Sequence, residues 1–123
     1  MSDARVAEFL TRLSARDAAA AWLARELLQA GWSVHGFFGP VQMDVWQLVL
    51  RRGSCGVRFG IERGYSDGVA VADGVTGGDA AAVADRAVAY RPITVAMSET
   101  KPAVASVMRD PAAALEWLIR RSG

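Results

Sequence analysis

The chain has 123 residues, with 14 basic and 13 acidic side chains and a formal net charge of +1 at pH 7. This length suits a single domain, residues 1–123, and a charge so near zero gives no whole-protein field that would attract nucleic acid. No apolar stretch reaches the ~18 residues of a membrane helix, and the first residues lack a secretory-signal pattern. Cys55 is the only cysteine, which excludes an internal disulfide. We therefore expect a cytoplasmic protein that contacts neither membrane nor nucleic acid directly.

The first thirty residues carry apolar side chains at helical spacing. They predict either one kinked helix or two helices, about residues 3–13 and 15–30. Ser14 is expected to cap the second part, with Asp17 reaching back to complete a capping box. Gly31 is a natural helix stop. The stripe expected to face the core consists of Ala20, Leu23, Ala24 and Leu27.

Residues 44–64 alternate in the way that predicts two strands of a hairpin. A type II′ turn at Gly53-Ser54 sets the register. The facing pairs are then Leu50 with Val57, Leu48 with Phe59, Trp46 with Ile61, and Asp44 with Arg63.

A further strand is expected before this hairpin, and a three-residue loop at 39–41 would end it. That loop would place Val34 opposite Trp46 and Trp32 opposite Leu48. All three strands then share one apolar face, and the other face mixes polar and apolar side chains. Its expected members are Ser33, His35, Phe37, Met43, Val45, Gln47, Val49, Arg58, Gly60 and Glu62.

The second half of the chain predicts shorter elements. After a turn through 62–68 we expect a strand at 69–72, a turn at Asp73-Gly74, a helix at about 79–90, and strands at 93–97 and 104–108. The final helix has Asp110 as N-cap and Pro111 in its first position, and its inward residues would be Leu115, Leu118 and Ile119. The predicted class is α+β, an antiparallel meander of at least three strands packed on one face by N- and C-terminal helices.

Two patterns could support catalysis, and each has a simpler explanation. Ser98 and Lys101 match the Ser-x-x-Lys pattern of penicillin-recognising enzymes, but Pro102 follows at once and the companion motifs are missing. His35 is the only histidine, and a pairing with Glu62 could do acid–base work. Two strand spacings, ~10 Å, would separate them, which is too far for a hydrogen bond. We therefore expect no enzyme.

Three other features could bind a ligand or react. Cys55 beside the hairpin turn is either a reactive thiol or a bystander, and no neighbouring base favours the first. Aspartates beside glycines could bind calcium, but such pairs also mark turns; they are Asp67, Asp73 and Asp79. Three arginines could touch phosphate but lack interleaved aromatics; they are Arg51, Arg52 and Arg58. No metal and no cofactor is expected.

The whole plan resembles small bacterial immunity proteins that accompany polymorphic or contact-dependent growth inhibition toxins. What resembles them is the leading amphipathic helix, the aromatic meander from WSVHGFF to VRFGIERG, the acidic loop region and the short closing helix. The resemblance implies a cytoplasmic protein that binds and neutralises the C-terminal toxin domain of one cognate toxin, often a nuclease, without catalysis. The alternatives are a secretion-chaperone-like or small-ligand-binding module, or a small enzyme using His35.

The expected partner surface is the acidic middle of the chain, since residues 62–85 carry a net charge of −4. Loops positioned by a rigid sheet commonly bind partners, and Tyr is a frequent hot-spot residue. The contacts predicted there are Glu62, Tyr65, Asp67 and Asp73. The polar sheet face beside it is expected to be partly covered. Trp22 and Trp117 lie on the expected outer sides of their helices, and are either packed under loops or further partner anchors.

Overall fold

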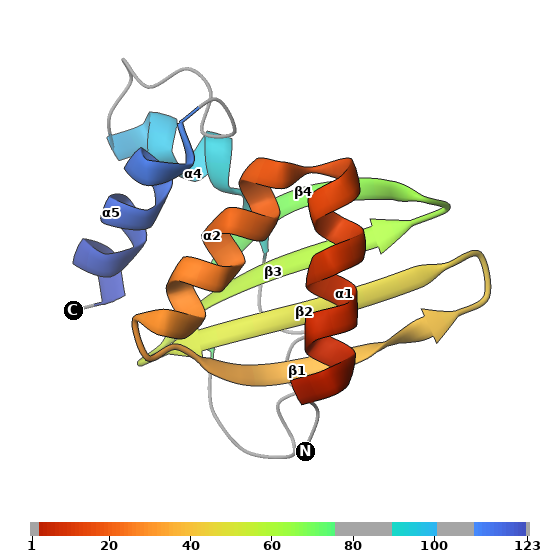
Figure 1. The fold of residues 1–123 in the computed structure, drawn as a ribbon. Helices are drawn as coiled ribbons and strands as arrows, with labels where there is room; N and C mark the ends of the chain where they lie inside the picture. The colour runs from red at the N-terminus through yellow and green to blue at the C-terminus, as the bar shows by residue number, and fades with distance from the viewer. Residues whose placement is uncertain (1–2, 76–89, 101–109, 123) are drawn as a thin grey trace.

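The computed structural model describes residues 3–75, 90–100 and 110–122, without the side chains of 3 and 98–100. Helices α1 (Asp3–Arg16) and α2 (Ala18–Gln29) lie across one face of an antiparallel sheet (Figure 1). The sheet is a meander with its strands in chain order: β1 (Ser33–Val41), β2 (Val45–Arg52), β3 (Cys55–Glu62), β4 (Tyr65–Ala72) and β5 (Arg91–Pro92). Helix α4 (Ile93–Thr100) contacts β4 and β5, and α5 (Pro111–Ser122) packs on α2. The predicted α+β class is confirmed.

The N-terminal helices meet at Asp17, which is the N-cap of α2. Its Oδ1 accepts a hydrogen bond from the backbone N–H of Ala20 at 3.1 Å, and its Oδ2 accepts one from Ser66 Oγ in β4 at 2.9 Å. Ser14 lies inside α1, so its expected role as the cap is wrong, because the Asp17 carboxylate satisfies the first turn itself. The inward stripe of α2 is fully buried, as predicted. Gly31, with a φ of 97°, follows the end of this helix.

The register of β2 and β3 matches the prediction at Leu50–Val57, Leu48–Phe59 and Trp46–Ile61. Gly53 begins the turn with a φ of 60°. The expected pairing of Asp44 with Arg63 is wrong, because each lies in a turn, with φ values of 56° and 54°. Asp44 instead accepts a hydrogen bond from Trp46 Nε1 at 2.8 Å.

The register of β1 differs from the prediction, because the strand continues through Gly39 and Pro40 to Val41. Val34 therefore pairs with Leu50, and Trp32 precedes the strand. His35 is an extra residue between the pairs that Val34 and Gly36 make with β2, and such a bulge turns the following side chains over. Phe37 consequently faces the helices, with its ring centroid 6.1 Å from that of Phe9.

Strand β4 begins at Tyr65, four residues earlier than predicted, because Arg63 and Gly64 alone make the turn. The strand expected at 93–97 is wrong, since these residues begin α4. Ile93, Ala96 and Met97 are buried at helical spacing. The expected helix at 79–90 and strand at 104–108 fall outside the described residues, apart from Tyr90, which is in neither helix nor strand.

Helix α5 begins as predicted, with the Asp110 carboxylate accepting a hydrogen bond from the N–H of Ala113 at 3.1 Å. Leu118 is fully buried, and Leu115 packs partly against the core. Two expectations for this helix are wrong: Ile119 is 38% exposed, whereas Trp117 is only 7% exposed. The core thus lies between the helices and one face of the sheet, and Trp46, Phe9 and Phe59 are among its largest side chains.

Candidate functional site

The second face of the sheet, away from α1 and α2, carries a mixed surface near two strand turns. Trp46 and Leu48 face the helices, so the alternating residues of β2 face the other way. Cross-strand pairing then aligns Phe38 with Gln47, Val41 with Val45, and Glu62 with Tyr65. We call this surface the distal patch; it consists of Phe38, Val41, Val45, Gln47, Glu62, Tyr65 and Asp67.

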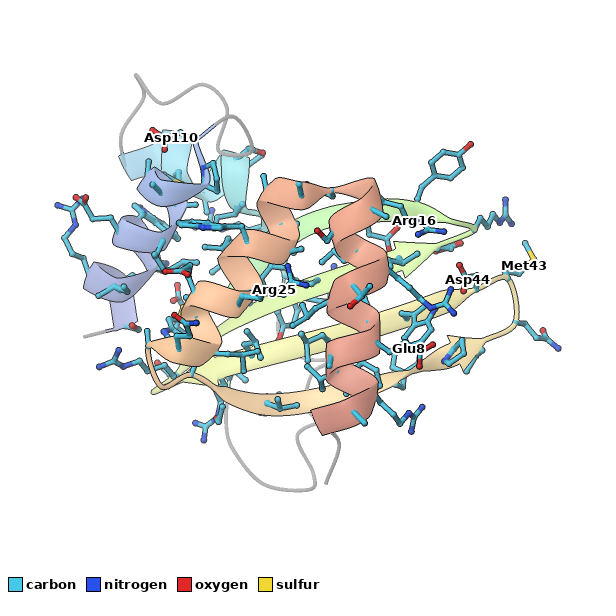
Figure 2. All side chains as sticks on the ribbon, in the orientation of Figure 1. Glu8, Arg16, Arg25, Met43, Asp44 and Asp110 are labelled. Carbon is cyan, nitrogen blue, oxygen red and sulfur yellow. The ribbon has the colours of Figure 1, made fainter. Side chains whose placement is uncertain are left out.

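The distal patch lies at the end of the sheet where the β1–β2 and β3–β4 turns extend beyond α1 (Figure 1). Met43 and Asp44 mark the first of these turns in Figure 2. Large apolar side chains are well exposed here: Phe38 by 43%, Val41 by 51% and Tyr65 by 76%. Exposed apolar groups clustered on one surface mark interaction sites more often than scattered ones do.

A bulge in β4 brings Asp67 onto this face. Phe59 pairs with Val69 and Ile61 pairs with Ser66, so Asp67 and Gly68 together lie opposite Gly60. Gly68 takes a φ of 81°, which a residue with a side chain rarely adopts. Because of this extra residue, Ser66 and Val69 both face the helices, while Asp67 faces away from them.

Gly60 provides the space that the Asp67 carboxylate occupies. A Cβ atom at Gly60 would lie 2.9 Å from Asp67 Oδ2 and 3.4 Å from the backbone oxygen of Trp46. The missing side chain therefore leaves a hollow of about 310 Å³ over the middle strands. Its lining includes Gln47, Arg58, Gly60, Glu62, Asp67 and Gly68.

The charges around this hollow are not balanced. Burial, and then the negative charge of Glu62, raise the pKa of Asp67, while Arg58 opposes the rise. Neither Glu62 nor Asp67 forms an ion pair or a side-chain hydrogen bond in the described part of the chain. The Arg58 guanidinium lies 4.7 Å from the centroid of the Tyr90 ring, a cation–π distance. Among the described residues that line the hollow, two carboxylates thus accompany one guanidinium.

Three arginines of α1 hold the strands that carry the distal patch. Arg5 donates to the backbone oxygen of Gly39, and Arg16 Nε donates to that of Gly64 at 2.5 Å. Arg12 lies over the Trp46 ring, 5.3 Å from its centroid. Both hairpins are therefore attached to the same helix, which fixes the patch on a rigid support.

The structure brings three of the predicted contact residues together and separates the others. Glu62, Tyr65 and Asp67 belong to the distal patch. Asp73 follows the opposite end of β4, roughly 20 Å from Asp67 at the usual rise per residue. There it forms an ion pair with Arg121 of α5.

The two tryptophans proposed as further anchors also lie elsewhere. Trp22 is 37% exposed on α2, among the helices that cover the other face of the sheet. Trp117 is buried, so its expected outward position is wrong, and Arg121 lies over its ring at 4.9 Å. Sequence reasoning missed Phe38 and Val41 as site residues, because the strand was expected to end before Gly39. The sequence offers no alternating signal there, because Gly39 and Pro40 interrupt the pattern and the register shifts between Phe38 and Val41.

The second face is partly covered, as expected, since Val49 is only 3% exposed and Arg58 is half-buried. His35 in β1 and Glu62 in β3 have β2 between them.

The Cys55 side chain is only 3% exposed. Burial first, and then the negative charge of Asp73, raise the pKa of its thiol to about 11, while Arg121 opposes the rise. Its thiol is therefore protonated at neutral pH, which favours the bystander interpretation.

Within residues 3–75, 90–100 and 110–122, no three His, Cys, Asp or Glu side chains gather as metal ligands would. Asp79 and Lys101 lie outside these ranges. None of the described helices has the length and apolar character needed to cross a membrane.

Comparison of the chain with protein-family models, curated proteins and solved structures gives no match.

Proposed function

We propose that this chain is a cytoplasmic, non-enzymatic protein that neutralises a cognate secreted bacterial toxin, with a nuclease as the favoured class, by forming a direct complex. The observation that carries this proposal is the distal patch, where exposed apolar side chains adjoin unpaired carboxylates on a rigid sheet. A protein partner would cover the apolar groups and neutralise the charges in one contact.

The apolar part of the patch supports protein binding. Phe38 and Val41 are exposed on β1, Tyr65 is exposed on β4 across the two middle strands, and Met43 in the β1–β2 turn is 55% exposed. Protein interfaces combine an apolar centre with a polar rim, and tyrosine is enriched among residues that dominate binding energy. The attachment of both hairpins to α1 reduces the ordering cost of binding, because the surface is already fixed.

The acidic part of the patch supports a basic partner. Glu62 and Asp67 form no ion pair within the described chain, and a basic surface would supply one. A nuclease needs a basic surface to hold the phosphates of its substrate. An acidic patch can dock on that surface, accelerate association and exclude the nucleic acid.

We expect a secreted toxin to be encoded beside the gene of this chain, and the test is co-expression of the chain with that toxin. We expect the chain to restore growth and to form a complex with the toxin domain in size-exclusion chromatography. The double variant Phe38→Ala/Tyr65→Ala should lose both effects while keeping its circular dichroism spectrum. Ile119→Ala, which also removes an exposed apolar group but from α5, is the matched control and should retain both. Full rescue by the double variant would exclude the distal patch as the binding surface.

A further inference from the structure

We infer that the hollow between β2, β3 and β4 receives one arginine side chain of the protein partner, with its guanidinium between Glu62 and Asp67. The identity of that partner rests on the proposed function, whereas the arginine preference follows from the hollow itself. The inference combines three independent features: the shape of the hollow, its charge and its aromatic border.

The shape suits one long side chain that enters from the second face. Gly60 leaves the floor open, and the bulge at Gly68 sets the Asp67 carboxylate at the wall. Gln47 on β2 and Glu62 and Arg58 on β3 supply the other polar side chains of the described lining. A volume of about 310 Å³ is too small for a folded element of a partner but ample for a single side chain.

The charge selects a cation. Glu62 and Asp67 outnumber Arg58, whose guanidinium is directed at the Tyr90 ring. An anionic ligand would increase the repulsion that already acts on Asp67. An incoming cation would relieve that repulsion and give both carboxylates a partner.

The geometry favours arginine over lysine. A guanidinium is a planar fork with five N–H donors, so it can bridge two carboxylates and the Gln47 amide oxygen at once. An ammonium is a compact point charge that gives no such bridge. Tyr65 and Phe38 do not line the hollow, but they pair across the strands with Glu62 and Gln47, which do, so their exposed rings can pack on a guanidinium or its alkyl stem at its border.

The closing experiment uses N-acetyl-arginine amide as the probe, with the complete chain and no toxin. Titration at low salt is followed by the backbone NMR signals of Gly60 and Gly68. We expect saturable shifts, none with the neutral isostere N-acetyl-citrulline amide, and at least about fivefold weaker binding of N-acetyl-lysine amide. Equal binding of citrulline would overturn the charge argument, and equal binding of lysine would overturn the choice of arginine.

Two variants locate the probe. Gly60→Ala fills the floor, and Asp67→Asn removes one charge without changing shape; each should weaken binding at least about fivefold. Gly36→Ala is the matched control, because a Cβ there meets nothing within 4 Å. A probe that binds Gly60→Ala and Asp67→Asn as well as the original chain lies elsewhere, and the inference is then wrong.

Failure of this inference and failure of the proposed function give different results. If the chain neutralises the toxin and the two variants bind that toxin unchanged, the arginine site is wrong while the proposed function stands. If the arginine probe binds in the hollow but no toxin is neutralised, the site stands and the proposed function is wrong.

Discussion

The carboxylate of Asp67 lies against the backbone of Gly60 and carries a charge that nothing in the described chain pairs with. Burial and Glu62 raise its pKa in the folded protein above the ordinary 3.8. The folded state therefore holds the proton more tightly than the unfolded state does. The stability that this provides is present below pH 3.8 and is lost as pH rises through the folded pKa. At neutral pH the ionised Asp67 weakens the fold, as residues kept for binding often do.

Asp67→Asn should therefore increase the free energy of unfolding at pH 7, by no more than about 1 kcal/mol for so exposed a charge. The gain should shrink as pH falls and disappear below the ordinary aspartate pKa, because the original side chain is then neutral too. Urea denaturation at several pH values measures this. A loss of stability at pH 7 would mean that the ionised carboxylate has a favourable contact.

Cys55 should be inert towards thiol reagents in the native protein. Its pKa of about 11, against 9.0 for an ordinary thiol, lowers the thiolate fraction at pH 7 by ~100-fold, and burial adds a steric barrier. The rate of reaction with Ellman's reagent, followed by absorbance, should be at least that much lower than in the same protein unfolded in urea. Comparable rates in the two states would show that the start of β3, where Cys55 lies, opens readily.

At the scale of elements, Asp17 connects three of them, since it ends α1, caps α2 and accepts a hydrogen bond from β4. Asp17→Ala should lower the free energy of unfolding by about 1–2 kcal/mol, the usual loss for an N-cap. Ser14→Ala is the control, because Ser14 lies within α1, and its effect should stay within about 0.5 kcal/mol. Chemical denaturation compares the two. An equal loss of unfolding free energy in both variants would mean that Ser14 does cap the helix, as the capping-box pattern predicts.

The elements that the sequence predicts well depend on local chemistry. A two-residue turn beginning with Gly53 fixes the register of β2 and β3, and Asp110-Pro111 fixes the start of α5. The end of β1 could not be predicted, because its turn uses Met43 and Asp44 at φ values of 67° and 56°, a conformation these residues seldom adopt. A residue elsewhere in the chain supports that turn: the backbone N–H of Arg63 donates a hydrogen bond to the backbone oxygen of Met43 at 2.8 Å.

The strand predicted at residues 93–97 is wrong for a different reason. Their β-branched residues favour a strand when considered alone, but β propensity yields to packing. As a helix, this segment buries Ile93, Ala96 and Met97 against the core. The candidate site was also predictable only where local sequence decides it. The composition of residues 62–67 indicated Glu62, Tyr65 and Asp67, but only the observed register of β1 adds Phe38 and Val41 to them.

At the scale of the whole molecule, the described acidic residues Glu62, Asp67 and Asp73 divide between the two ends of β4 and should divide in function as well. The pair Glu62→Gln/Asp67→Asn should slow association with the toxin domain and reduce its salt dependence, because unpaired charges steer encounter. Asp73→Ala should leave both unchanged and cost at most about 1 kcal/mol of stability, since Asp73 only pairs with Arg121 on the surface. Stopped-flow association at low and high salt tests this. Slowing by Asp73→Ala instead would move the interface to the α5 end.

The meander also determines the order in which the molecule can assemble. Strands β2, β3 and β4 each pair with the strand made just before, across connections of two or three residues, so each loop closure costs little conformational entropy. The contact of α2 with α5 instead joins segments that are far apart in the sequence, since α2 ends at residue 29 and α5 begins at residue 111. Local pairing is fast and distant docking is slow. During synthesis the four long strands can therefore form while α5 is still inside the ribosome, and α5 then docks after those strands already exist.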